Sequence, residues 1–236
     1  MQRIERGDVR RVAACRLRVG RGEWAYARAH KLQIAAEFKR QREIKPGYFN
    51  GPIQILLDHR IEHDTFVGDF ATSDFASFVY WRAQGLIDDS VRDCFGCAVV
   101  RSREGHVLLG VQAGGNLNAG RAYCPSGFID PADVRADRTI DIDGSIAREI
   151  GEETGLDLSA LTRVAGYILV AAEASIAIGV EYRSALVADE LRAVVMANLA
   201  RQATPELAGV LLVASPADLA GIATTAHIPP LLRALL

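Results

Sequence analysis

The first 90 residues alternate apolar and polar positions over short stretches. Between residues 24 and 42, apolar residues recur among lysines and arginines at the spacing of a partly buried helix. Residues 53–57 form a short apolar run typical of a strand. Residues 72–84 begin with Thr, Ser and Asp and end before Gly85, which predicts a capped helix. This part of the chain therefore predicts a small α/β region.

Longer apolar segments follow from residue 91. A hairpin is predicted around Glu104 and Gly105, which separate two runs of aliphatic and β-branched residues. Further elements are predicted as strands at 163–172, 180–187 and 208–213, and as helices at 144–154, 187–202 and 229–235. This order favours a mixed sheet with helices packed on its faces. We therefore expect an N-terminal appendage over residues 1–90 and a main domain over residues 91–236.

Composition narrows the class of protein. Half of the 236 residues are hydrophobic and 24% are charged, which excludes a disordered or collagenous chain. The longest apolar stretch, 164–180, is interrupted by Glu173 and is too short to span a membrane. The N-terminus lacks the apolar run of a secretory signal. Four cysteines are too few to staple this chain, so we expect reduced thiols and a cytoplasmic protein.

Charge is distributed unevenly along the chain. Residues 1–45 contain 13 Lys or Arg against 5 Asp or Glu, whereas the remainder contains 14 against 24. A basic segment of this kind can be a solvated helix face, a surface that attracts phosphorylated substrates, or a nucleic-acid arm. The chain shows no recognisable nucleic-acid module, so nucleic acid is not the expected partner.

A cluster of glutamates carries the clearest chemistry. In the segment GSIAREIGEETGL, Glu149, Glu152 and Glu153 are spaced so that a helix places them on one face. Such like charges repel each other, and a divalent cation removes the repulsion because Mg²⁺ and Mn²⁺ prefer carboxylate oxygens. From spacing alone, an exposed acidic helix without a ligand is an equal alternative.

Residues 148–156, REIGEETGL, match every defined position in the second half of the Nudix box, R-E-aliphatic-x-E-E-x-G-aliphatic. Upstream, the turn PSG ending at Gly127 resembles the P-G-G turn of that family. Asp133 stands where the family has its first glutamate, and an insertion within residues 134–140 lengthens the segment before the helix. Asp141 or Asp143 is then available as the helix cap.

This resemblance, which covers the chain from residue 93 onward, implies a Nudix-type α/β/α sandwich and a Nudix hydrolase. Such an enzyme cleaves a nucleoside diphosphate linked to another group and uses Mg²⁺ or Mn²⁺. The resemblance implies metal binding by Glu152, Glu153 and the Gly127 carbonyl, Glu149 as a metal ligand or the base, and Arg148 as the partner that orients a glutamate. Bound cations neutralise the anionic diphosphate and lower the pKa of a bound water.

The general base and the substrate are less defined. Glu206 is the candidate base outside the box, with Glu173, Glu181 and Glu190 as alternatives. The segments YFNGP, TSDF and PEL resemble the Nudix branch that cleaves UDP-sugars to UMP and sugar 1-phosphate. Arg121 and Tyr123 are candidates to contact the substrate phosphate and base, respectively. Oligomeric state, leaving group and the phosphorus attacked are left open.

Other features favour ordinary roles. Cys94 and Cys97 have zinc-ligand spacing but no second pair follows, so buried thiols of a strand are favoured. Cys124 lacks a histidine at triad spacing. The glycine-rich residues 110–120 do not fit a P-loop and predict a loop at the edge of the site. The alternative function is a Nudix-like domain that binds a nucleotide metabolite without hydrolysing it, which intact glutamates argue against.

Overall fold

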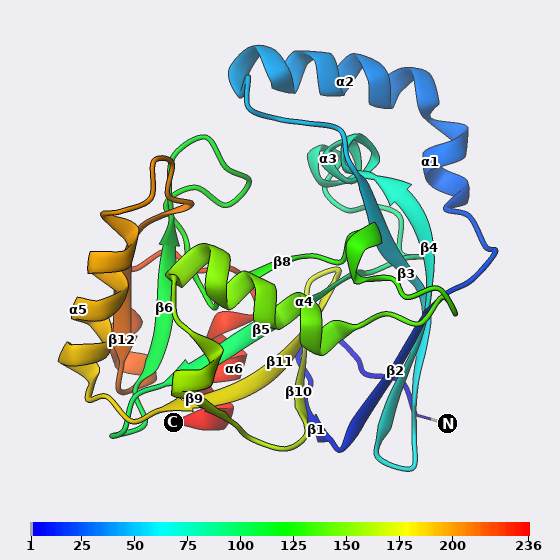
Figure 1. Ribbon diagram of the computed structural model, residues 1–236. Helices are drawn as coiled ribbons and strands as arrows, with labels where there is room; N and C mark the ends of the chain where they lie inside the picture. Colours follow the sequence, from blue (N-terminus) through cyan, green and yellow to red (C-terminus); the bar gives the residue numbers. More distant parts are fainter. Residues whose placement is uncertain (1) are drawn as a thin grey trace.

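The computed structural model describes residues 2–236 and has a mixed α/β fold, as predicted (Figure 1). The strands of its large sheet are β1 Val9–Val12, β5 Asp93–Arg101, β6 Val107–Gln112, β7 Ala122–Tyr123, β8 Ser126–Phe128, β9 Leu161–Arg163, β10 Tyr167–Ala172, β11 Ser175–Ser184 and β12 Leu207–Val213. The main order is β1-β10-β11-β5-β6-β12, with β7, β8 and β9 paired to β6, β5 and β11. Strands β5 and β11 are parallel, and the other pairs are antiparallel.

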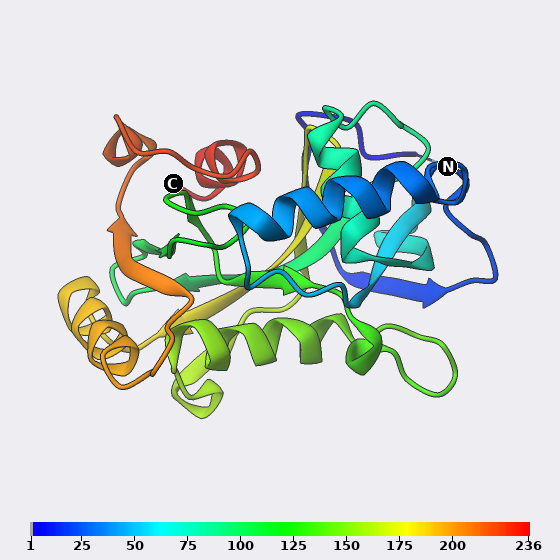
Figure 2. The ribbon, with the colours of Figure 1, turned by 90° about the horizontal axis from the view of Figure 1, so that it is seen from above.

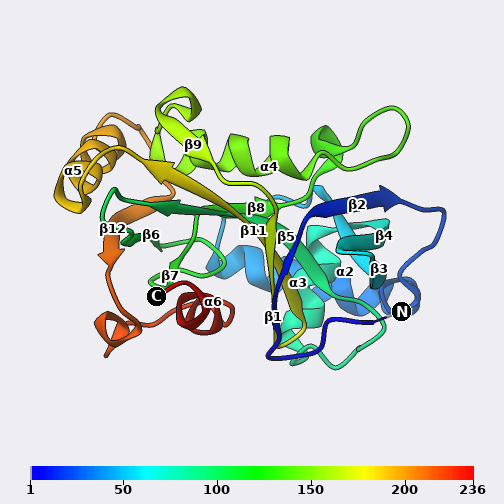
Figure 3. The ribbon, with the colours of Figure 1, turned by 90° about the horizontal axis from the view of Figure 1, so that it is seen from below.

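Helices cover both faces of the large sheet. Helices α4 (Ile142–Glu149) and α5 (Ala188–Leu199) lie on one side, and α6 (Ile228–Leu235) lies on the other (Figures 2 and 3). A Cβ atom on Gly96 would overlap the Ile146 side chain, so this glycine lets α4 lie close to β5. Among residues 2–236, no helix is both long enough and apolar enough to span a membrane.

A small sheet stands beside the large one. It consists of β2 (Ala14–Val19), β3 (Pro52–Glu62) and β4 (Thr65–Asp74), with β2 parallel to β4. His63 and Asp64 join β3 to β4 with positive φ angles, as a two-residue hairpin turn requires. The sequence predicted only residues 53–57 as a strand here. Strand β4 has no regular alternation, whereas residues 15–19 of β2 alternate apolar residues with arginines, a signal that the prediction missed.

Three helices lie next to the small sheet: α1 (Ala25–Ala29), α2 (Lys31–Ile44) and α3 (Phe75–Ala83). Helix α3 packs against β4, and α2 packs against α3, which it crosses at the edge of the molecule (Figure 1). The predicted helix over 24–42 is thus two helices. The helix predicted from residue 72 begins at Phe75 because Thr72 and Ser73 pair within β4. Asp74 is the cap: its side chain accepts a hydrogen bond from the Ser77 amide at 2.8 Å.

The first 90 residues also contribute to the large sheet. Strand β1 pairs with β10 at its edge, with Val9 opposite Val170. Val12, Leu17 and Phe66 belong to the same hydrophobic core as the strands of the large sheet. These contacts join the N-terminal region to the rest of the chain, and a domain boundary near residue 90 stays a prediction.

The second half follows the predicted order with shifted bounds. The hairpin around Gly105 is confirmed, with φ of +95° at that glycine. The strand predicted over 163–172 is two strands, β9 and β10, because Gly166 turns the chain at φ +83°. The strand predicted over 180–187 begins at Ser175, since the small residues of the segment predicted no clear start.

Candidate active site

A cleft of about 690 Å³ lies between α3, the start of β5, the C-terminal end of α4 and the segment before α6. Eight residues were assigned a role at the site from the sequence, not counting the alternative bases. Seven of them line the cleft: Arg121, Tyr123, Gly127, Arg148, Glu149, Glu152 and Glu206. The eighth, Glu153, accepts a hydrogen bond from the Tyr123 hydroxyl at 2.7 Å. The fold therefore brings together residues that are as far as 85 positions apart in the sequence.

The glutamates belong to a helix that changes its winding. Asp141 caps α4 by accepting from the Gly144 amide at 3.1 Å. After Glu149 the helix continues as a π-helical turn over Ile150–Thr154 and ends at Gly155, whose φ is +65°. Such wide turns are rare and frequently occur at functional sites. The predicted cap and end of this helix are confirmed, whereas the wide turn carries no sequence signal.

The three glutamates differ in their environment. Glu149 is 7% exposed and Glu153 is 1% exposed, whereas the side chain of Glu152 is 60% exposed. The prediction of one shared face is therefore only partly met: two carboxylates are buried, and the third lies on the surface. The first two are held by fixed partners, and Glu152 is the most free to adjust to a ligand.

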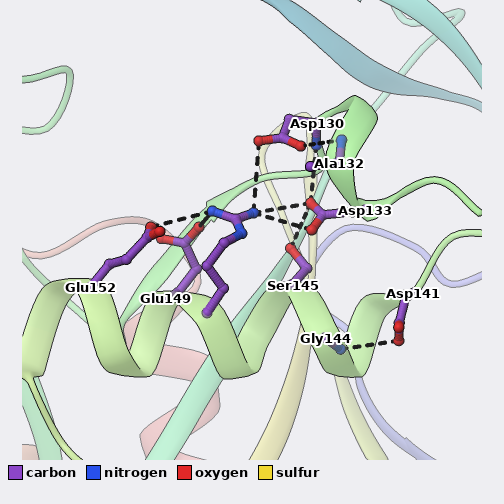
Figure 4. A network of polar contacts seen from close by, with 9 residues as sticks. Asp130, Ala132, Asp133, Asp141, Gly144, Ser145, Glu149 and Glu152 are labelled. Carbon is purple, nitrogen blue, oxygen red and sulfur yellow. Dashed lines mark hydrogen bonds and ion pairs between the residues drawn. The ribbon is translucent and has the colours of Figure 1, made fainter.

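Arg148 is the hub of the acidic network (Figure 4). Its Nη1 donates to Glu149 Oε1 at 2.8 Å and to Glu152 Oε2 at 3.3 Å. Its Nη2 donates to both carboxylate oxygens of Asp133, at 3.1 and 3.2 Å, and lies 3.8 Å from Asp130. These carboxylates raise the pKa of Arg148 although burial acts against it. The guanidinium therefore fixes Glu149 and balances part of the negative charge.

The predicted insertion leaves this arrangement in place. Val134 and Ile140 form an antiparallel bridge that closes residues 135–139 into a loop. This loop lies against β2, where Arg138 donates to the Val19 carbonyl at 2.9 Å. Asp133 is thereby brought back to α4, and the Ser145 hydroxyl donates to its carboxylate at 2.9 Å. Asp133 thus holds Arg148 across the insertion.

Burial changes the acidity of the two inner glutamates. Desolvation raises the pKa of Glu149 to about 7, and the Arg148 charge only partly offsets it. Burial raises the pKa of Glu153 well above its usual range, and the hydrogen bond from Tyr123 acts in the opposite direction. Carboxylates perturbed in this way inside a cleft are typical of functional sites.

Gly127 makes room for one of these carboxylates. It lies in β8, paired with Gly96 of β5. A Cβ atom on residue 127 would overlap the Glu149 carboxylate. The glycine is therefore needed for close approach, and it places its own backbone beside Glu149.

Tyr123 lies deep in the cleft, and Arg121 lies at its rim. Tyr123 is 2% exposed, and its hydroxyl is already engaged by Glu153. Arg121 is exposed, and its Nη1 donates to the Thr224 carbonyl at 2.8 Å. Tyr123 is thus placed to orient Glu153, and Arg121 is placed to meet a ligand at the rim.

The candidate bases fall in different places. Glu206 and Glu173 are exposed residues that line the cleft. Glu181 is buried outside the cleft, where it pairs with Arg183 at 3.1 Å, and Glu190 accepts from the Val187 amide at the start of α5. The geometry leaves Glu206 and Glu173 as the candidates that reach a ligand in the cleft.

The other sequence features take ordinary positions. Cys94 and Cys97 are free, buried thiols of β5, as predicted, and Cys124 is also free and buried. Leu117 and Asn118, within the glycine-rich residues 110–120, line the cleft, so that loop lies at its edge as predicted.

Several lining residues had no sequence signal. They are aromatic or polar residues from the N-terminal region, the start of β5 and the segment before α6: Phe78, Trp81, Arg82, Asp93, Phe95, Thr225 and His227. Each is unremarkable in its local sequence, and only the packing of α3 and α6 around β5 brings them to the cleft. The N-terminal region thus forms one wall of the site.

The donor set suits a hard divalent cation. Glu153 Oε2 is buried and has no hydrogen-bond partner among the described residues. Two carboxylates and a nearby backbone carbonyl offer the oxygen ligands that Mg²⁺ and Mn²⁺ prefer, with substrate phosphates completing the shell. In the part of the chain that the structure describes, no three His, Cys, Asp or Glu side chains are already arranged as a metal cluster. Arg148 instead lies between Glu149 and Glu152.

Comparisons with known proteins find likeness only at the level of structure. No protein-family model matches the chain, and no curated protein matches it. Among solved structures it is similar to DR0079 from Deinococcus radiodurans, with 18% identity over 76% of this chain and 98% of that one and a TM-score of 0.44. It is also similar to the Nudix hydrolase RenU from M. smegmatis (16% identity, 60% and 81% covered, TM-score 0.37). A third similar structure is an Ap4A hydrolase from C. elegans, with 18% identity over 59% of this chain and 92% of that one and a TM-score of 0.40.

Proposed function

We propose that this protein is a Mg²⁺- or Mn²⁺-dependent hydrolase of phosphoric anhydride bonds. Its substrate is a nucleoside diphosphate linked to another group. The observation that carries the proposal is a pair of buried carboxylates: Glu149 lies against Gly127 and lines an open cleft, and Glu153 lies behind it, bound by the cleft residue Tyr123. Buried like charges are costly, and a structural role would not require an oxygen of Glu153 to lack a partner.

The residues divide the work as follows. Glu149, Glu152, Glu153 and the Gly127 carbonyl would hold the cation, which supplies charge neutralisation and an acidified water. Arg148 keeps Glu149 in place and Tyr123 keeps Glu153 in place. Arg121, at the rim, binds phosphate, and Glu206 accepts the proton of the attacking water at its carboxylate.

Within this class we propose a nucleotide sugar as the first substrate to test, UDP-sugar being the lead. Support comes from the segments that resemble that branch: Asp74 of TSDF caps α3, which forms a wall of the cleft, and Glu206 of PEL lines the cleft. The aromatic side chains of that wall also suit a ring beyond the diphosphate.

The test is a panel of UDP-sugars, ADP-ribose, dinucleotides and nucleoside triphosphates, followed by product analysis. We expect release of a nucleoside monophosphate with Mg²⁺ and none in excess EDTA. The variant Glu153→Gln is expected to be inactive, and Glu43→Gln on exposed α2 is the matched control. Undiminished hydrolysis in EDTA, or a fully active Glu153→Gln protein, would overturn the proposal. Tight nucleotide binding without turnover would favour a sensor.

A further inference from the structure

One end of the cleft carries polar groups that the proposed chemistry does not use. Among residues 2–236, three buried side-chain atoms have no hydrogen-bond partner: Glu153 Oε2, Thr225 Oγ1 and His227 Nε2. Glu153 belongs to the carboxylate cluster. Thr225 and His227 line the same cleft from the segment that leads into α6, and His227 is 3% exposed. Buried polar groups are normally paired, so this end of the cleft is incompletely satisfied.

Asp93 adds a carboxylate to the same end. It is the first residue of β5 and it lines the cleft, partly exposed. Among the described residues, no side chain forms a hydrogen bond or an ion pair with its carboxylate. Phe95 follows on the same face of β5, and its ring meets the His227 ring edge to face at 5.2 Å. The end of the cleft around Asp93, Phe95 and His227, here called the ring end, is therefore acidic and aromatic.

The arginines of the cleft form their hydrogen bonds with groups other than Asp93, although the charge of Arg82 acts to lower the pKa of Asp93. Arg148 is saturated by acidic partners. Arg121 donates to the Thr224 carbonyl and Arg82 to Asn118 Oδ1 at 3.0 Å, and within residues 2–236 neither has a carboxylate partner. A phosphate is attracted to these arginines and to the cation site, whereas an unpaired carboxylate repels it. The part of the substrate that reaches Asp93 should therefore carry no negative charge and should donate hydrogen bonds.

We propose that the ring end binds the neutral ring of the substrate, with Asp93 accepting hydrogen bonds from ring O–H or N–H groups and Phe95 contacting the ring face. This proposal rests on the proposed function, because it places the diphosphate at the neighbouring carboxylates. A sugar and a nucleobase share the required chemistry: donors along an edge and an apolar face. His227 is held neutral, since burial lowers its pKa to about 4, so it adds no charge that would attract phosphate.

The experiment measures binding by the full-length protein with Mg²⁺ present, because the proposed phosphate site needs its cation. The probes are inorganic pyrophosphate, which has no ring and no nucleoside, and UMP, GMP and glucose 1-phosphate, which have no phosphoric anhydride bond to cleave. We expect Asp93→Asn to weaken the binding of at least one ring-bearing probe by about tenfold, which is the scale of losing a hydrogen bond to a charged group. Pyrophosphate binding should stay unchanged. The exposed substitution Asp189→Asn is the matched control and should alter nothing.

Each outcome has one meaning. Loss confined to the nucleotides shows that the ring end binds the nucleoside, and loss confined to glucose 1-phosphate shows that it binds the sugar. No loss, or an equal loss for pyrophosphate, overturns the proposal. Asp93→Ser repeats the comparison if the Asn variant folds poorly, as judged by thermal unfolding. Absence of Mg²⁺-dependent hydrolysis with Asp93-dependent ring binding refutes the proposed function alone, and the reverse result refutes the ring end alone.

Discussion

The carboxylate of Glu149 occupies the space that a side chain on Gly127 would fill. Residue 127 lies in β8 and Glu149 ends α4, so the two elements that form the cation site meet without a side chain between them. Arg148 Nη1 donates to the same carboxylate at 2.8 Å. The position of Glu149 is thus fixed by close packing against a glycine and by a hydrogen bond from a guanidinium.

This relationship predicts a large effect of Gly127→Ala. The added methyl group displaces Glu149, so we expect kcat to fall about 10²-fold, the scale of losing one preorganised electrostatic group. Gly151→Ala is the matched control. Gly151 lies two residues after Glu149, in the turn that continues α4, and no atom of the surrounding structure would lie within 4 Å of a Cβ there. Kinetics of both variants on the best substrate check the prediction, and equal activity of the two would contradict it.

Glu152→Gln and Glu153→Gln separate catalysis from stability. We expect each to lower kcat by about 10²-fold or more, because each removes a charge that holds the cation. The unfolding temperature of Glu153→Gln should not fall in metal-free buffer, since a buried carboxylate with a raised pKa is costly to ionise. Glu152 is exposed, so its substitution should change stability by about 0.5 kcal/mol at most. A large loss of stability with unaltered kcat would show that these carboxylates are structural.

Tyr123→Phe tests the orientation of Glu153. The phenol donates to Glu153 Oε1, and its removal leaves the carboxylate free to turn. Loss of such an outer partner typically weakens metal binding by about 10- to 100-fold. We therefore expect activity to require more Mg²⁺, with kcat largely recovered at saturation. Tyr48→Phe, which loses a hydroxyl bonded to Lys45 away from the cleft, is the control. An unchanged Mg²⁺ requirement in the Tyr123 variant argues against the orienting role.

Local signals predicted the elements of the fold better than their partners. The cap at Asp74, the turn at Gly105 and the helix end at Gly155 depend on neighbouring residues, and the structure has all three. Strands β1 and β2 depend on distant partners, β10 and β4. Two adjacent arginines interrupt the alternation of β1, whereas residues 15–19 of β2 do alternate apolar residues with arginines, a signal that the prediction missed. The partner of β1 lies more than 150 positions away and that of β2 lies 51 positions away, and neither pairing carries a local signal.

The residues of the candidate site also fall into two groups: those with a local sequence signal and those that only tertiary packing brings to the cleft. Arg148, Glu149 and Glu153 were found because one helix carries them at a recognisable spacing. Glu152 is exposed whereas Glu153 is buried, and the spacing of the glutamates reveals neither this difference nor the π-helical turn that carries both residues. Asp93 and His227 line one cleft only because α6 packs on the face of the large sheet opposite α4 (Figure 3). Their place in the cleft therefore could not be predicted from either segment alone.

Asp93 also predicts a specific dependence of stability on pH. Burial raises its pKa from an ordinary 3.8 to about 7, and the Arg82 charge offsets this only in part. Between those pH values the folded protein binds more protons at this residue than the unfolded chain does. Its contribution to the free energy of unfolding therefore falls as pH rises from 3.8 to about 7 and then levels off.

The comparison of wild type with Asp93→Asn isolates this contribution. His227, whose pKa is lowered to about 4, has the opposite dependence, because its folded form resists protonation as pH falls. His227 is present in both proteins, so its effect cancels in the difference. We expect the variant to gain stability relative to wild type as pH rises from 5 to 8, as measured by urea unfolding at each pH. A difference that stays constant over this range would show that the Asp93 carboxylate is ionised in the fold without cost.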